Sequence, residues 1–351
     1  MGVYSKYDNY TANKRECNAE FVDEGELTNA RVSEIFEGKF YDTVNVKISE
    51  NITSIGYRAF YFLWGLKHIE IPSSVKKIES SAFDYCPHLE SVKLNEGLEF
   101  IDGYAFSSCK KLKSIEIPRS VAELSECAFA YCDSLASITV NEKNRVYESI
   151  DGNLYTKGGE TLIQYAIGKN DKTFVVPNGV KTIGFRAFLD CKALERIVIP
   201  KSVTCIGDFA FELCNNLECI TVDAGNKAYK SIDGNLYTKG GDVLIRYAVA
   251  KKDKSFDVPS HVKTIGVEAF SYCENLEVVN LYDGIFAIEE GAFKNCTALK
   301  KVKIPQSVIT IGYWAFFGNR KLTIYCEAEA CPKTWNKNWS GNRRPVIWGD
   351  K

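Results

Sequence analysis

Apolar residues recur along the chain in a fixed pattern around an Ala-Phe pair. The pattern is Ile-x-x-x-Ala-Phe-x-x-Cys-x-x-Leu-x-x-Ile-x-Ile, and one complete copy runs from Ile101 to Ile117 and is followed by Pro118. The end of each copy alternates apolar and polar residues and is rich in β-branched side chains, which predicts a short strand. The Ala-Phe-x-x-Cys-x-x-Leu part spaces small and apolar residues by three, which suits a tight helical turn.

The copies keep a strict spacing. Successive Ala-Phe pairs are 23 residues apart, except for two steps of 59 that equal a longer unit of 36 plus one of 23. One copy cannot bury its own apolar side, so neighbouring copies must stack on each other. We therefore predict a repeat solenoid, a curved parallel β-ladder of about twelve rungs with short helical or 3-10 turns on its convex side. The repeated phenylalanines are Phe60, Phe83, Phe106, Phe129, Phe188, Phe211, Phe270, Phe293 and Phe316.

The two longer units, residues 141–177 and 223–259, contain near-copies of one insertion, which begins SIDGNLYTKGG in both. Each unit should still end in a ladder strand, at 174–176 and 256–258. Paired glycines at 158–159 and 240–241 lie between alternating segments, which predicts two β-hairpins that project from the stack. A duplicated structural insertion is the favoured interpretation, and a pair of equivalent docking sites is the alternative.

The open ends of such a stack need caps with a polar outer face. We expect an N-terminal cap at 1–43, the solenoid at 44–325 and a C-terminal cap at 326–351. The N-terminal segment has Leu27, Val32, Ile35 and Phe36 at helical spacing, with a helix stop at Gly38. In the C-terminal segment three tryptophans could cover the last rung, and a ligand platform is the rival view. They are Trp335, Trp339 and Trp348.

This pattern resembles the BspA-like leucine-rich repeat family, also called the treponemal type. The resemblance rests on the 23-residue repeat, the Ala-Phe-x-x-Cys-x-x-Leu core, the SIDGNLYTKGG insertion and a C-terminal segment like the family's usual cap. It covers roughly residues 44 to 348. The resemblance implies a surface protein of a bacterium or protist that binds host proteins or other cells, with no enzymatic activity in the repeat.

The chain has 13 cysteines, and seven of them occupy one repeat position. Leu63 and Asn319 stand there in the first and last copies. A position that accepts Leu is an apolar packing site, and free Cys behaves as a small buried hydrophobe. We expect no disulfide framework, although stacking leaves a chance bridge open, and no zinc site, because the Cys-x-x-x-x-Cys spacings have no nearby His. The seven are Cys86, Cys109, Cys132, Cys191, Cys214, Cys273 and Cys296.

Charge and motifs exclude several classes of function. The 44 Lys and Arg residues balance 45 Asp and Glu residues, so nucleic acid and anionic membranes are not expected as partners. No apolar run is long enough to span a bilayer. We find no nucleophile elbow, zinc-protease motif, P-loop or dinucleotide fingerprint, and the three histidines are scattered, so we expect no enzyme, cofactor or metal site. Residues 1–10 carry no secretory leader, which predicts a cytoplasmic protein as written, or a surface or secreted one if a leader precedes it.

The polar side of the strands is the expected binding face. In the first rungs the central position of this face alternates in charge through Lys47, Glu70, Lys93 and Glu116. Opposite charges on neighbouring strands can therefore pair with each other and need no ligand. From rung six to rung ten this column has no basic residue, and a lysine cluster at 300, 301 and 303 follows. A second candidate surface consists of aromatic residues just before the Ala-Phe pairs, namely Tyr57, Phe185, Phe209, Tyr313 and Trp314. The candidate protein-binding residues are Val175, Val198, Cys219, Thr221, Val278, Asn280, Lys301, Lys303 and Trp314.

The leading hypothesis is a monomeric, non-enzymatic scaffold for adhesion or for binding a host or cell-surface protein through the concave strand face. The first alternative is a carbohydrate-binding module that uses Tyr and Trp, Trp314 foremost, as stacking platforms. The second is an intracellular assembly or decoy protein, which the missing leader favours.

Overall fold

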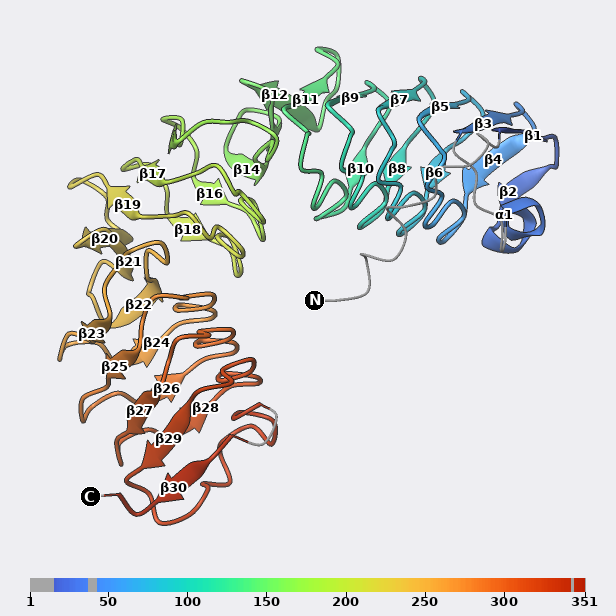
Figure 1. The fold of residues 1–351 in the computed structure, drawn as a ribbon. Helices are drawn as coiled ribbons and strands as arrows, with labels where there is room; N and C mark the ends of the chain where they lie inside the picture. Colours follow the sequence, from blue (N-terminus) through green and yellow to red (C-terminus); the bar gives the residue numbers. More distant parts are fainter. Residues whose placement is uncertain (1–15, 37–42, 342–343, 351) are drawn as a thin grey trace. The chain divides into compact units, whose positions relative to one another are not determined.

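The computed structural model describes residues 16–36, 43–341 and 344–350. The chain forms two compact units, Met1–Val146 and Tyr147–Lys351, and each is a stack of similar rungs (Figure 1). A rung is one repeat copy. It contributes a strand to a first ladder, a shorter strand to a second ladder, and then an Ala-Phe turn. The predicted repeat solenoid is confirmed in both units.

In the first unit the short strands of the second ladder form one parallel sheet of five, in the order β10-β8-β6-β4-β2. The first-ladder strands pair in parallel twos, β1 with β3, β5 with β7 and β9 with β11. The first ladder contains β1 Glu16–Phe21, β3 Thr43–Ile48, β5 His68–Ile71, β7 Ser91–Leu94, β9 Ser114–Ile117 and β11 Ser137–Val140. The second contains β2 Gly25–Leu27, β4 Ile52–Ile55, β6 Lys77–Ile78, β8 Phe100–Ile101 and β10 Glu123–Leu124.

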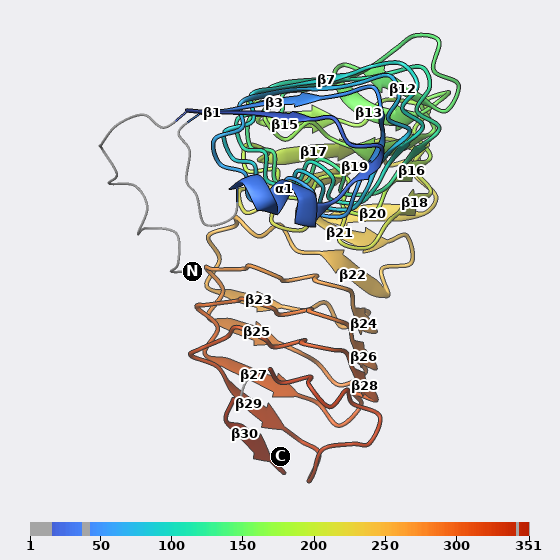
Figure 2. The ribbon, with the colours of Figure 1, turned by 90° about the vertical axis from the view of Figure 1, so that its right-hand side faces the viewer.

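In the second unit the two ladders lie on opposite sides of the stack, with β23, β25, β27 and β29 on one side and β24, β26 and β28 on the other (Figure 2). The first ladder contains β15 Thr173–Val175, β17 Arg196–Ile199, β19 Cys219–Val222, β23 Ser255–Asp257, β25 Val278–Asn280, β27 Lys301–Ile304, β29 Thr323–Cys326 and β30 Val346–Trp348. The second contains β14 Thr161–Gln164, β16 Thr182–Ile183, β18 Cys205–Ile206, β22 Val243–Arg246, β24 Thr264–Ile265, β26 Ala287–Ile288 and β28 Thr310–Ile311.

The twelve expected rungs are all present, and the structure adds a first-ladder strand at each end, β1 and β30. The strand pairing of the first ladder is interrupted in both units. The first ladder of the second unit is not continuous, because β15-β17-β19 and β23-β25-β27-β29-β30 are separate sheets. The second insertion lies against the free edge of β19, where the N–H of Ile220 donates to the carbonyl of Gly234. The insertion therefore takes the place of the next parallel strand.

Both insertions are built in the same way. β12 Tyr147–Ile150 and β13 Asn153–Thr156 form a hairpin, a second hairpin joins β13 to β14, and β14 pairs in parallel with β16. β20 Tyr229–Ile232, β21 Asn235–Thr238 and β22 repeat the arrangement beside β24. The glycine pairs lie in hairpin turns, as predicted. The strands of these hairpins extend the second-ladder sheet, however, and do not simply project from the stack. The tight first turn has positive φ at Asp151 (49°) and Gly152 (71°), as in a type I′ hairpin.

The near-identical residues of the insertions make internal contacts. The side-chain oxygen of Asn153 accepts the N–H of Ala166 at 2.9 Å, and that of Asn235 accepts the N–H of Ala248 at 3.0 Å. Lys169 donates to the side chain of Asp151 at 2.7 Å. Tyr155 and Tyr237 are fully buried. These contacts support the structural interpretation of the duplication over the docking one.

The Ala-Phe turns form a third set of hydrogen bonds between rungs. The N–H of Phe83 donates to Ala105 of the next rung, and the N–H of Tyr85 donates to Ser107. Within the turn the N–H of Ala82 donates to Glu79, three residues earlier, as in a 3-10 turn. Ser81 (φ 57°) and Tyr85 (φ 58°) are left-handed, which stops the turn from continuing as a helix. The only α-helix in the described residues is α1 Asn29–Phe36.

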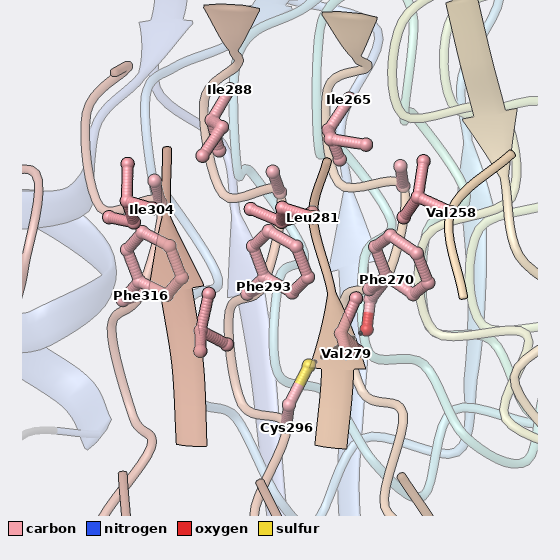
Figure 3. Packing of buried hydrophobic residues seen from close by; sticks show 14 of the residues in the cluster. Val258, Ile265, Phe270, Val279, Leu281, Ile288, Phe293, Cys296, Ile304 and Phe316 are labelled. Carbon is pink, nitrogen blue, oxygen red and sulfur yellow. Dashed lines mark hydrogen bonds between the residues drawn. The ribbon is translucent and has the colours of Figure 1, made fainter. Parts of the chain in front are cut away.

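The repeated phenylalanines stack along the core of each unit. Ring centroids are 4.9 Å apart for Phe270 and Phe293 and 5.1 Å apart for Phe293 and Phe316 (Figure 3). In the long units Tyr165 and Tyr247 take the phenylalanine position, 36 residues after the preceding Phe. Tyr247 lies 5.3 Å from Phe270, and its hydroxyl donates to Asp253 at 3.0 Å. The hydroxyls of Tyr165 and Tyr247 thus have acidic partners, Asp171 and Asp253, each from the same insertion as its tyrosine.

The repeated cysteines are hydrogen-bond donors as well as packing groups. The thiols of Cys109 and Cys132 donate to the phenylalanine carbonyl of the preceding rung at 3.3 and 3.1 Å. In the last copy the amide of Asn319 makes the same bond, to Phe293 at 2.8 Å. The purely apolar interpretation of this position was therefore incomplete. Burial raises the pKa of the Cys86 thiol to about 12, so this thiol stays protonated and unreactive. All 13 cysteines lie in the described residues, and none of them forms a disulfide.

Aromatic residues close the core at both ends of the chain. Phe21 of β1 meets Phe60 edge-on at 5.9 Å, and Trp339 meets Phe316 edge-on at 5.8 Å. Trp335 and Trp339 are each 5% exposed and lie in the core, so neither offers a free ring face as a ligand platform. Helix α1 packs through Val32 and Phe36, as the helical spacing predicts, but Leu27 lies in strand β2 and not in the helix. The expected stop at Gly38 lies outside the described residues.

Candidate functional site

The register of β15, β17 and β19 brings three of the predicted residues into one column. Val175 pairs with Val198, and Val198 pairs with Thr221. The Val175 side chain is 61% exposed, the largest exposed fraction among the large hydrophobic residues described. Val198 is half-buried and Thr221 is exposed. The adjacent residues Phe174, Ile197 and Ile220 point into the core and hold the column in place.

On other first-ladder strands, the equivalent central position carries pairs of polar side chains. Lys93 lies 2.7 Å from Glu70 in the first unit, and Lys47 lies 2.5 Å from Glu20. In the second unit the amide of Asn280 donates to Asp257 at 2.6 Å. Such pairs satisfy an exposed strand face but add little stability. In β15, β17 and β19 no charged side chain occupies this column, which distinguishes this sheet from the sheets that contain the polar pairs.

Cys219 lies in the neighbouring column, in register with Arg196 and Thr173. Its sulfur is 3.7 Å from the Thr221 hydroxyl. It is half-buried next to Gly234 in the tight turn of the second insertion, where an added Cβ would lie 3.2 Å from the sulfur. Cys219 is therefore at the margin of the exposed column.

The other predicted strand residues lie on a different sheet. Val278 pairs with Lys301 and Asn280 pairs with Lys303, both between β25 and β27. The structure does not join this sheet to the first by hydrogen-bonded strands, so the face expected across rungs six to ten is divided between two sheets. The insertion separates its two parts.

The predicted lysine cluster is neutralised locally. Lys300 forms an ion pair with Glu277. Lys303 lies 3.2 Å from Glu327 and 3.9 Å from Asp350, and Lys301 sits 4.5 Å above the Tyr325 ring. Each cation thus has an acidic or aromatic neighbour from an adjacent rung. The solvated-surface interpretation fits these contacts better than a basic site does.

Trp314 lies in an Ala-Phe turn and not on a strand. Its ring stacks between Tyr313 and Phe317, with centroids 4.6 Å away on each side, and the side chain is 38% exposed. Its two neighbours therefore occupy much of the ring surface. Trp314 and the strand column belong to different faces of the rung.

Two groups of residues were missed by sequence reasoning. The first is an aromatic group on turns of the first unit, in which Trp64 and His88 are half-buried and the others exposed, and of which only Tyr57 was noted. Its other members follow the Ala-Phe pair or lie near the repeated Cys, outside the positions considered. They are Tyr61, Phe62, Trp64, Tyr85 and His88.

The second is a buried ionic network in the second unit. Lys294 lies 2.8 Å from Glu268 and 3.5 Å from Glu212, and Arg186 lies 3.0 Å from Glu212. Arg246 of β22 donates to the carbonyl of Glu268 at 2.6 Å. Burial, and then the Glu212 carboxylate, raise the pKa of Glu268. Each residue of this network has an ionic or hydrogen-bond partner in the turns, which indicates a structural role for the network.

In the described residues no three His, Cys, Asp or Glu side chains are placed to hold a metal ion. Among the described helices none has the length and apolar character needed to span a membrane.

Comparison with known proteins identifies the repeat. The family model for the BspA type leucine rich repeat region, with six copies, matches residues 31–154, 167–240 and 247–329. No curated protein sequence matches the chain. A leucine-rich repeat protein from Eubacterium ventriosum is similar in structure, with a TM-score of 0.59, 23% identity, and coverage of 93% of this chain and 95% of that one.

Two further crystal structures align over most of the chain. A leucine-rich cell surface protein from Faecalibacterium prausnitzii has a TM-score of 0.49 and 23% identity, with 95% of this chain and 93% of that one covered. The pneumococcal vaccine antigen PcpA has a TM-score of 0.47 and 20% identity, with 97% and 85% covered. The family model covers well over half of the sequence, and the stacked rungs agree with it. This chain belongs to the BspA-type leucine-rich repeat family.

Proposed function

We propose that this protein is a non-enzymatic scaffold that binds another protein through the uncharged column Val175–Val198–Thr221. The observation that carries the proposal is the 61% exposure of Val175 at the head of that column. Apolar side chains on an exposed strand face lose contact with water when a partner covers them, which favours association.

The surroundings of the column suit a protein partner. The centre of a protein interface is depleted in charged residues, while its rim is polar. Here the exposed Arg196 lies in the next column, and Lys172 and Glu195 form a 2.6 Å ion pair just beyond it. The column is fixed by backbone pairing on β17 and by the core beneath it, so little conformational entropy would be lost on binding.

Adhesion is the finer form of this proposal. Membership of the BspA-type family supports a protein-interaction scaffold, and the resemblance implies contact with host proteins or with other cells. We therefore infer that the partner is displayed on a cell or matrix surface. A candidate panel consists of immobilised extracellular-matrix proteins and intact epithelial or bacterial cells.

The double variant Val175→Lys/Val198→Lys should lose binding to the member of this panel that the wild type recognises. Two ammonium groups would have to be desolvated against the partner, so we expect affinity to fall by about tenfold or more. Surface plasmon resonance on the matrix proteins and flow cytometry on the cells would measure this loss.

Val278→Lys is the matched control, because it makes the same change on the separate sheet. It should retain binding, and all variants should melt close to wild type, since the changed positions are not fully buried. Unchanged affinity in the double variant would reject the proposed column. An equal loss in Val278→Lys would mean that the contact is not confined to β15-β17-β19.

A further inference from the structure

The turns of the first unit carry a concentrated aromatic surface on two adjacent rungs. Tyr57 is 54% exposed, Tyr61 39%, and Phe62 and Tyr85 38% each. These four residues lie within 29 positions of sequence and account for a third of the twelve exposed large hydrophobic residues described. We call Tyr57, Arg58, Tyr61, Phe62 and Tyr85 the aromatic turn surface.

Its side chains hold one another in place. The Tyr61 ring contacts the Tyr85 ring of the next rung edge-on at 5.9 Å, and Phe62 contacts Trp64 edge-on at 5.6 Å. Trp64 in turn contacts His88 at 5.9 Å, and the His88 ring nitrogen bonds to the Trp64 carbonyl at 3.0 Å. The surface is therefore preorganised although it is exposed, which reduces the entropy lost on binding.

Arg58 supplies the polar group at its centre. The guanidinium sits over the rings of Tyr57 and Tyr61, with its carbon 5.1 and 5.0 Å from the two ring centroids. Among the described residues no carboxylate forms an ion pair with it. The charge of Arg58 acts on the carboxylate of Asp84, but the Asp84 side chain is largely buried. Contact with both rings holds the guanidinium at the surface, where its N–H groups can donate two parallel hydrogen bonds to a carboxylate.

We propose that the aromatic turn surface is a second binding site, independent of the strand column, for a protein segment that presents a carboxylate beside apolar side chains. Tyr, Trp and Arg are the residues that dominate binding energy in protein interfaces. Arg58 is the cation of this surface and has no carboxylate ion-pair partner among the described residues, so it calls for an anionic group. The rings make edge contacts and are covered by Arg58, so they offer no broad flat face of the kind on which a sugar ring stacks.

A peptide selection tests this site directly. The full chain would be immobilised and used to select from a phage-displayed library of random peptides, with counter-selection on Arg58→Gln. We expect the enriched peptides to contain Asp or Glu next to Leu, Ile or an aromatic residue. A synthetic copy of the strongest peptide would then be titrated into each variant by calorimetry.

Arg58→Gln should lower the affinity for that peptide by about tenfold or more. Arg58→Lys should restore little of this affinity, because an ammonium cannot form the bidentate pair. Tyr61→Ala should weaken it as well by removing the support of the guanidinium. Val175→Lys/Val198→Lys should bind the peptide as wild type does, which separates this site from the strand column. Thermal melts identify any variant that has lost its fold.

Three results would overturn the inference. The selected peptides could lack acidic residues, or no peptide could remain enriched once binders of Arg58→Gln are removed. A glycan array probed with the same protein could instead give a signal that Tyr61→Ala abolishes, which would assign the surface to carbohydrate.

Discussion

Replacing Lys294 with Met should lower the free energy of unfolding by about 3 kcal/mol at pH 7. Lys294 is the cation shared by Glu268 at 2.8 Å and Glu212 at 3.5 Å, and both carboxylates are buried. Removing it leaves two desolvated negative charges near each other. Urea unfolding followed by circular dichroism would measure the loss.

The control is Lys300→Met, which removes a lysine paired with Glu277 at the surface. The side chain of Lys300 is 58% exposed, so this change should cost no more than about 0.5 kcal/mol. If the two variants lost equal stability, the buried network would have no special role.

The loss in Lys294→Met should also depend on pH. The pKa of Glu268 is already raised in the wild type by burial and by Glu212. The folded state then binds this proton more tightly than the unfolded chain does, so stability decreases as the pH rises from the unfolded pKa through the raised one. Without Lys294 the pKa should rise further, and the deficit should shrink between pH 7 and pH 5. A deficit that is the same at both values would contradict this.

Replacing Phe293 with Ala should cost about 3–5 kcal/mol. The side chain is fully buried, and its ring stacks on Phe270 and Phe316 at 4.9 and 5.1 Å. Its loss leaves a cavity between three rungs, and each rung depends on its neighbours for stability. Equilibrium unfolding in urea gives the change directly.

Phe286→Ala makes the same chemical change at a position that is 47% exposed, near Lys263. We expect it to cost less than about 1 kcal/mol, because little new cavity is formed. A small effect at Phe293, comparable to that at Phe286, would mean that the aromatic stack does not support the solenoid.

Much of the fold follows from spacing alone. The 23-residue period of the Ala-Phe pair fixes the rungs, and the steps of 59 already place a hidden aromatic position 36 residues after Phe129 and Phe211. Tyr165 and Tyr247 stand at those positions and could have been found in this way. The presence of Asn319 at the cysteine position was likewise a signal that a donor is needed there.

The candidate site was harder to predict. Lys300 and Glu277 are 23 residues apart, so their pairing follows from the repeat, and the apparent lysine cluster could have been discounted. The break between β19 and β23 could not be foreseen, because spacing does not show that an insertion occupies the edge of β19. Glu212 and Lys294 each follow a repeated Phe but are three rungs apart, so their spacing gave no sign that the side chains meet.

The most direct test of the proposed binding column is site-specific photo-crosslinking. Benzoylphenylalanine would replace Val175 in one protein and Thr204, which is exposed beside β18 on the same rung as Val198, in another. Both would be irradiated on the panel of matrix proteins and intact cells. We predict a discrete adduct from position 175 and none from position 204. Equal labelling at both positions, or labelling at 204 alone, would contradict the assignment of the binding face.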